Sequence, residues 1–132
     1  MNSFQHDIKL QPLRIPANWC IGWNTLFEVN PTEDNIKAGL FGGSSKFQAV
    51  NVELRLLVDV AWTPEDDVNG NFYLYVEYAP WERNEKGRRI KVKELSFSDS
   101  KTVHEFTTRD RIEIVSELEK VLIGNSEWIE HS

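Results

Sequence analysis

Cysteine, histidine and excess positive charge are all scarce in this chain of 132 residues. Its single cysteine, Cys20, excludes an intramolecular disulfide. Its three histidines, His6, His104 and His131, are too scattered to form a structural zinc site with that cysteine. The formal net charge is −6, which argues against a protein drawn to nucleic acid or to membranes by its overall charge. We therefore expect no metal, no nucleic-acid partner and no membrane partner.

Long hydrophobic runs are also missing. The most apolar stretch, 54–62, contains Arg55 and Asp59 and is far shorter than the roughly 20 residues that a membrane helix needs. Residues 1–7 lack the basic region and apolar stretch of a signal peptide. These absences, together with the lone cysteine, predict a cytoplasmic protein.

What the sequence does contain is the composition of an ordinary globular protein, with 40% hydrophobic and 27% charged residues. A chain of this length buries about two-thirds of its unfolded surface, so it needs neither a cofactor nor a disulfide to fold. No repeat and no linker interrupts it. We expect a single domain over 1–132, with an ordered core over about 7–124 and a loosely held tail over 125–132.

Alternating apolar residues give the clearest structural signal. One phase of 52–62 is apolar throughout, and 72–78 repeats the pattern after a turn at 65–70. These two runs predict a central antiparallel hairpin with Leu56 facing the core. Weaker alternation predicts further strands over 19–29, 90–97 and 103–106, the second with a bulge near Lys93.

A helix follows the strands. Thr108 has the chemistry of an N-cap, and Gly124 is a natural C-terminal stop. The predicted buried face consists of Ile112, Val115, Leu118, Val121 and Leu122. The predicted fold class is α+β, an antiparallel sheet of five or six strands with one C-terminal helix packed on one face.

The segment from Gly39 to Lys46 is rich in glycine and ends in lysine. A phosphate-binding loop would need Gly-Lys-Ser/Thr between a strand and a helix, whereas here Ser45 precedes the lysine and a strand is expected to follow. We interpret 32–47 as a flexible loop with a short helical turn near 34–38.

Catalytic combinations are weakly supported. Cys20 with His104 is the one possible thiol pair, but no motif accompanies it, and a free cysteine is commonly a small buried hydrophobe. Asp59 and Glu77 form a possible carboxylate pair on neighbouring strands, although both face away from the apolar phase, which favours ordinary solvated charges on a sheet face. We expect no catalytic residues and no enzyme activity. Buried carboxylates with raised pKa values would favour the enzyme hypothesis.

Two charged segments and the tryptophans are candidates for a binding surface. The acidic turn Glu65-Asp66-Asp67 suits a basic partner, although it is also an ordinary solvated turn. The basic stretch from Arg83 to Lys93 could grip phosphates, or could protect an edge strand from aggregation. Of the five tryptophans, Trp81 is the best candidate for an exposed anchor of a partner, and a semi-buried residue that fills the core is the equal alternative. The core is predicted to include Trp19, Trp23 and Trp62.

Three segments together resemble the immunity proteins of bacterial polymorphic toxin systems. They cover roughly Ile15 to Leu122. They are Ile15-Pro16-Ala17-Asn18-Trp19-Cys20-Ile21 with Asn24, Phe27 and Asn30-Pro31; Val58-Asp59-Val60-Ala61-Trp62-Thr63-Pro64-Glu65 with Asp67, Gly70 and Phe72-Tyr73-Leu74; and Thr107-Thr108-Arg109 through Leu122.

The resemblance implies a small non-enzymatic protein that binds and neutralises one cognate toxin domain in the cytosol. A basic nuclease is one candidate for that toxin, because an acidic inhibitor associates faster with a basic target. The predicted partner-binding residues are Glu65, Asp66, Asp67 and Trp81. The alternative is a module that binds a small molecule or carbohydrate through aromatic residues on the sheet. A large apolar pocket with convergent polar groups would favour that alternative.

Overall fold

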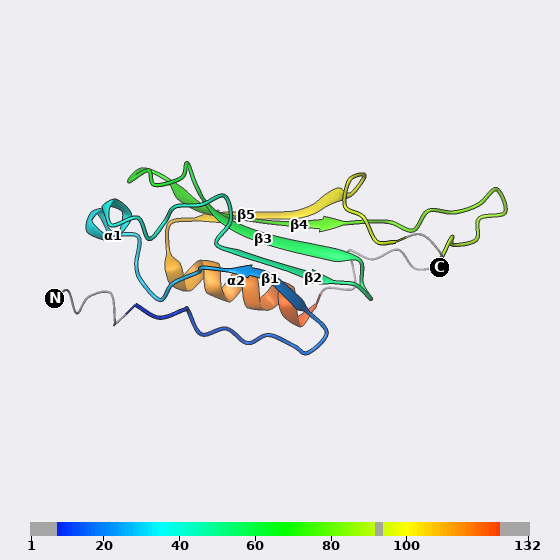
Figure 1. Ribbon diagram of the computed structural model, residues 1–132, viewed down its shortest axis with the longest axis horizontal. Coiled ribbons are helices and arrows are strands. Elements are labelled where there is room, and N and C mark those ends of the chain that lie inside the picture. Colours follow the sequence, from blue (N-terminus) through cyan, green and yellow to red (C-terminus); the bar gives the residue numbers. More distant parts are fainter. Residues whose placement is uncertain (1–7, 92–93, 125–132) are drawn as a thin grey trace.

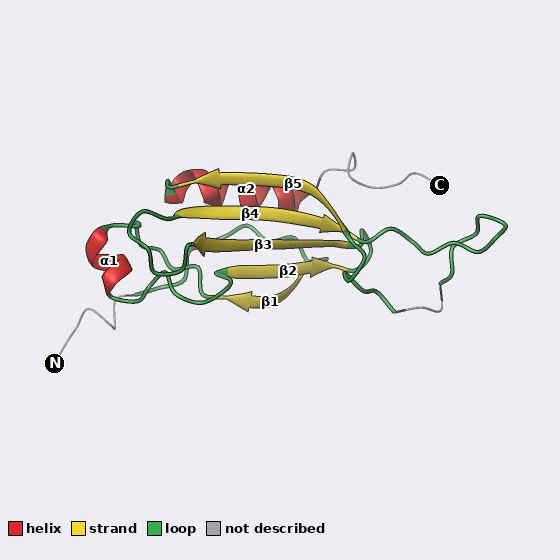
Figure 2. Ribbon diagram, turned by 90° about the horizontal axis from the view of Figure 1, so that it is seen from above, coloured by secondary structure: helices red, strands yellow, loops and turns green. Residues whose placement is uncertain are grey.

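The computed structural model describes residues 8–91 and 94–124, in which an antiparallel sheet carries a helix on one face (Figure 1). Its five strands lie side by side in chain order (Figure 2), so each strand after the first is paired with the strand that precedes it. This arrangement confirms the predicted α+β class. The elements are β1 (Cys20–Asn24), α1 (Glu33–Lys37), β2 (Phe47–Asn51), β3 (Leu56–Thr63), β4 (Asn71–Tyr78), β5 (Lys101–Thr108) and α2 (Arg111–Ile123).

The predicted central hairpin is formed by β3 and β4, which pair from Leu56 opposite Tyr78 to Trp62 opposite Phe72. Alternate side chains of both strands are buried, because one face of the sheet packs on the core. At the end of this core, Trp62 meets Phe72 with ring centroids 5.1 Å apart.

The predicted strand over 52–62 is wrong in its first four residues. Val52 is 60% exposed, and 52–55 form the turn that joins β2 to β3. The fully buried Asn51 holds this turn, since its Oδ1 accepts the Leu54 N–H at 2.9 Å. Arg55 takes a left-handed φ of 58°. The period-two pattern therefore runs through a tight turn. The strand β2 was not predicted, because it lies between the segment interpreted as a loop, 32–47, and the predicted strand over 52–62.

The C-terminal helix α2 lies against one face of the sheet, with the N-terminal segment running along its other side (Figure 1). That segment is fastened to the helix by polar bonds. The Trp19 Nε1–H donates to the Leu122 carbonyl at 2.7 Å, and the Arg14 N–H donates to Glu119 at 2.8 Å. Because Trp19 is only 6% exposed, this segment completes the core on the far side of the helix.

The helix begins later than predicted. Its N-cap is Asp110, whose carboxylate accepts the Ile112 N–H at 2.8 Å, while Thr108 lies in β5. Ile112 is 61% exposed, so its predicted burial is wrong, and Ile114 is buried instead. Residues two positions apart along a helix are separated by roughly 200° around its axis, so Ile112 and Ile114 cannot share a face. Gly124 ends the helix as predicted.

The segment between β1 and β2 contains the predicted helical turn as α1, capped by Thr32. Its loop is anchored in the core, because Phe41 is 2% exposed and its ring centroid lies 5.0 Å from that of Trp62. The glycine-rich part of the loop is thereby held over one end of the sheet.

Beyond β4, the chain leaves the sheet as a long arm (Figure 2, far right). The strand predicted over 90–97 is wrong for its described residues, which form turns and irregular backbone. Its expected bulge near Lys93 falls on 92–93, outside the described residues. The last strand, β5, is longer than the predicted 103–106. The predicted tail 125–132 also lies outside the described residues.

Candidate functional site

The face of the sheet opposite α2 carries a row of side chains that crosses all five strands. The pairing register aligns Trp23 with Gln48, Gln48 with Asp59, Asp59 with Tyr75, and Tyr75 with Glu105. Directly opposed residues of a sheet point to the same side. In Figure 2 the sheet is seen from this side, with α2 behind β4 and β5. We call this side the open face.

The open face combines aromatic rings with negative charge. Tyr73 and Tyr75 lie with ring centroids 5.5 Å apart, and the Tyr73 hydroxyl donates to the Glu105 carboxylate. This bond, with a smaller contribution from desolvation, raises the pKa of Tyr73 to about 12. By strand alternation the other open-face acids are Asp59 and Glu77, so the described strands present only negative charge here.

Asp59 is the central residue of the row and is only 3% exposed. Its carboxylate accepts the Ser45 hydroxyl at 2.9 Å and the Gln48 Nε2–H at 2.9 Å. Burial raises the pKa of Asp59, and the hydrogen bonds from Ser45, Gln48 and Tyr75 partly oppose that rise. The row is therefore tied together through one buried carboxyl.

The possible carboxylate pair of Asp59 and Glu77 does share the open face. Glu77 is opposite Leu57, so the two acids are diagonal neighbours, roughly 7–8 Å apart by standard sheet geometry. The Glu77 Oε2 atom is buried without a hydrogen-bond partner among the described residues. Asp59 thus meets the criterion of a buried carboxylate with a raised pKa, while neither acid is among the residues that line the cavity of about 590 Å³ described below.

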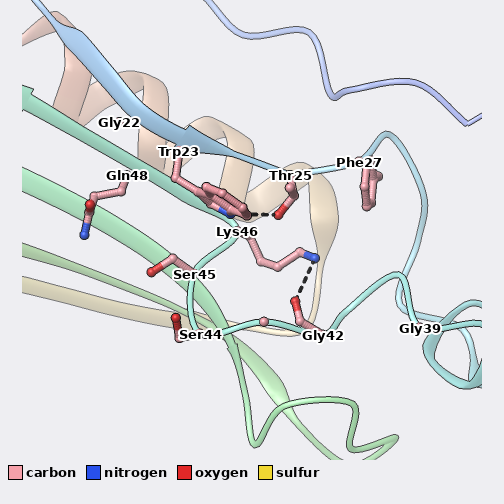
Figure 3. A pocket seen from close by; sticks show the side chains of 11 residues that line it. Gly22, Trp23, Thr25, Phe27, Gly39, Gly42, Ser44, Ser45, Lys46 and Gln48 are labelled. Carbon is pink, nitrogen blue, oxygen red and sulfur yellow. Dashed lines mark hydrogen bonds between the residues drawn. The ribbon is translucent and has the colours of Figure 1, made fainter.

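A cavity of about 590 Å³ opens between the β1–β2 end of the sheet and the glycine-rich loop (Figure 3). At its edge, the Trp23 indole N–H donates to the Thr25 hydroxyl at 3.2 Å. Trp23 is 54% exposed, so its predicted place in the core is wrong: it stands on an edge strand and faces the uncovered side. The cavity is lined by Gly22, Trp23, Thr25, Phe27, Gly39, Gly42, Gly43, Ser44, Ser45, Lys46 and Gln48.

Lys46 contributes a buried ammonium to this cavity. The residue is 3% exposed, and its Nζ donates to the carbonyls of Leu40 at 2.9 Å and Gly42 at 3.2 Å. The Nζ also lies 5.2 Å from the centroid of the Phe27 ring. Desolvation lowers the pKa of Lys46, while the nearby charges of Asp66 and Glu65 act in the opposite direction.

The predicted acidic turn is thus placed beside its own chain's lysine. The Asp66 N–H donates to the Phe41 carbonyl at 3.2 Å, which fastens the turn to the glycine-rich loop. The Asp67 carbonyl accepts the Trp62 indole N–H at 2.9 Å. Glu65 and Asp66 are exposed and Asp67 is half-buried, so the turn still presents charge to a partner.

Trp81 lies at the opposite end of the sheet, at the base of the arm. Its ring is flanked by the guanidinium groups of Arg55, 4.1 Å from the centroid, and Arg89, 5.2 Å away. Trp81 is half-buried, which fits the semi-buried alternative, and Trp23, predicted to be in the core, is the more exposed ring. The structure does not bring Trp81 and the acidic turn together, because the eight residues of β4 separate them.

The possible thiol pair is separated across the sheet. Cys20 is on β1 and His104 on β5, four strand spacings or roughly 19 Å apart. Cys20 is exposed rather than buried, since β1 is an edge strand. The His104 Nε2 instead lies 2.6 Å from the Glu117 carboxylate of α2. These two residues cannot act together as nucleophile and base.

Within 8–91 and 94–124, no three side chains of the metal-binding types gather in one place. In that same part of the chain, neither helix has the length and apolar character needed to cross a bilayer.

Comparison of the chain with protein-family models, with curated proteins and with solved structures gives no match. The geometry of the open face and its cavity is therefore the basis for a functional proposal.

Sequence reasoning missed this surface because its residues come from five separate strands. A signal was present in β4, where Tyr73, Tyr75 and Glu77 occupy the phase opposite the core. No comparable signal pointed to Lys46 and Gln48, because a strand at 47–51 was not predicted.

Proposed function

We propose that this protein is a non-enzymatic, cytoplasmic immunity protein that binds a basic toxin domain through the open face of its sheet. The observation that carries the proposal is the cross-strand row from Trp23 to Glu105, with Tyr73 and Glu77 beside it. Tyrosine and tryptophan are residue types that anchor protein interfaces, and here Trp23 is exposed while Tyr73 and Tyr75 are half-buried. The resemblance to immunity proteins gives the class of partner.

The size of the open face suits this role. The outer strands are roughly 19 Å apart, and an eight-residue strand extends about 27 Å. A surface of this order, extended by the neighbouring loops, approaches the roughly 800 Å² per partner of a standard protein interface. A flat, acidic and aromatic surface matches a basic protein partner better than it matches an acidic one.

Co-expression provides the test. The first step is to inspect the gene immediately upstream of this chain's gene; if it encodes a large secreted toxin, the C-terminal domain of that toxin is the one to co-express. Alone it should arrest growth, and this chain should restore growth. Failure of this chain to restore growth or to bind the purified domain would contradict the immunity function.

A matched pair of charge reversals tests the surface. Glu105→Lys places a positive charge on the open face and should weaken protection and binding. Glu53→Lys makes the same charge change in the exposed turn between β2 and β3, away from that face, and should retain both. Equal effects of the two substitutions would remove the open face from the binding surface even if the protein protects.

A further inference from the structure

The cavity beside Trp23 is large enough for a ligand of its own. Its volume of about 590 Å³ falls within the roughly 300–1,000 Å³ typical of small-molecule sites. We propose that it binds an uncharged carbohydrate of one or two sugar rings. This inference does not rest on toxin binding, although Trp23 and Gln48 belong both to the open-face row and to the lining of the cavity.

Trp23 supplies the ring platform. Its indole lines the cavity, is 54% exposed, and is held in place by the bond from its N–H to Thr25. Figure 3 shows Trp23, Thr25 and Phe27 along one side of the cavity, with the glycine-rich loop on the other. An aromatic face of this kind packs against the C–H groups of a sugar ring and leaves the hydroxyls free for hydrogen bonds.

The polar groups of the cavity are placed to meet hydroxyls. The Lys46 ammonium has three N–H donors, and two of them have carbonyl acceptors among the described residues. The Gln48 Nε2 is engaged with Asp59, while its Oε1 lies beside Gly22 and can accept a hydrogen bond. The Ser44 hydroxyl is exposed on the loop side. The third donor of the Lys46 ammonium can therefore donate to a ligand oxygen.

The surrounding charge selects a neutral ligand over an anionic one. Glu65 and Asp66 lie near enough to Lys46 to act on its pKa, and Asp59 is bonded to the cavity residues Ser45 and Gln48. An anion entering the cavity would gain one ammonium and face these three carboxylates. A neutral polyhydroxyl compound gains the hydrogen bonds without that repulsion.

The backbone of the loop leaves room for such a ligand. Gly39, with a φ of +84°, has open space where a side chain would begin. A residue with a Cβ would be strained at this φ.

The experiment is saturation-transfer NMR on the full chain with three uncharged probes, cellobiose, lactose and N-acetylglucosamine, and with two anionic probes, glucuronate and inorganic phosphate. For phosphate the readout is the shift of the protein's amide signals. We expect saturable binding of at least one uncharged sugar at millimolar concentration. Binding of the anions alone, or of none of the five, would overturn the proposal.

A matched pair of variants locates the site. Trp23→Ala should weaken sugar binding roughly tenfold or more, the size expected from loss of an aromatic stacking surface. Ile21→Ala removes a residue of similar exposure, 48%, from the same strand but outside the cavity, and should bind like the parent. Equal binding by the two variants would contradict this location.

Lys46→Met tests the ammonium, with circular dichroism as the check on folding. If this variant folds, its sugar affinity should fall, and unchanged affinity would remove Lys46 from the site. If it does not fold, the Trp23 pair still decides the proposal. Tyr73→Ala, on the open face but outside the cavity, should leave sugar binding intact while weakening toxin binding, which separates the two proposals.

Discussion

On the face that α2 covers, β3 and β4 present aliphatic and aromatic side chains that are at most 3% exposed, from Leu56 to Tyr78. On the open face the same two strands present Asp59, Tyr73 and Glu77. The two sets alternate along one backbone, so a single hairpin serves two purposes. The covered set excludes water and stabilises the fold, and the open set remains available for a partner.

Asp59 is the exception to this division, because it is buried on the open face. No helix covers it. Its cover consists of neighbouring side chains of the row and the loop, including Ser45, Gln48 and Tyr75. A buried acid at the centre of the open face ties the conformation of that face to the protonation of one carboxyl.

A charge placed on the covered face should have the largest effect on stability. Leu56→Asp buries an unpaired carboxyl at a site with 0% exposure and should unfold the domain. Its neighbour Leu57 points to the open face, and Leu57→Asp should remain folded. Far-ultraviolet circular dichroism and thermal melting compare the two. A Leu56→Asp protein that melts like the parent would show that the facing of β3 is wrong.

Substitutions on the buried and exposed sides of α2 should change the free energy of unfolding by smaller amounts. Leu118 is fully buried against the sheet, and Leu118→Ala should lower the free energy of unfolding by about 2–5 kcal/mol. Ile112→Ala, at a residue that is 61% exposed, should change it by less than about 0.5 kcal/mol. Urea titration measures both values. Similar losses in the two variants would mean that α2 is not packed as described.

The buried acid of the open face should make stability depend on pH. The pKa of Asp59 is raised on folding, so the folded protein binds its proton more tightly than the unfolded chain does. The ionised group therefore reduces stability, and this cost appears as pH rises from the ordinary value of 3.8 through the raised pKa.

Asp59→Asn removes this titration. Relative to the parent, the variant should gain stability as pH increases from about 3.8 to 7, measured by urea titration at each pH. A constant difference between variant and parent across that interval would contradict a raised pKa for Asp59.

The smallest expected effect concerns the acidic turn, which lies at one end of both faces. The triple variant Glu65→Gln, Asp66→Asn and Asp67→Asn should fold normally, because amides preserve the local hydrogen bonds. It should slow association with the toxin domain by up to about tenfold at low salt, and the loss should shrink as salt rises. Stopped-flow binding measures this rate. An unchanged rate at low salt would remove the turn from the binding surface, and Trp81→Ala would be the next variant.

The central part of the fold could be predicted from the local pattern of apolar residues in the sequence. Alternation over 56–62 and 72–78 predicted the central hairpin because a half-buried strand needs apolar residues at every second position. The same rule failed at 52–55, where the alternation continued through a turn that Asn51 and Arg55 create. For α2, the sequence predicted burial of Leu118, Val121 and Leu122, whereas the exposure of Ile112 required the position of the sheet.

The sequence by itself determined the α+β class, the hairpin, the C-terminal helix and the acidic turn, because each depends on residues close together in the chain. Tertiary structure alone decided which face stays open, since that depends on where α2 packs. It also aligned Trp23, Asp59 and Glu105 in one row and enclosed Lys46 beneath a loop. Register between strands is set by all the pairings at once, so no single segment carries that information.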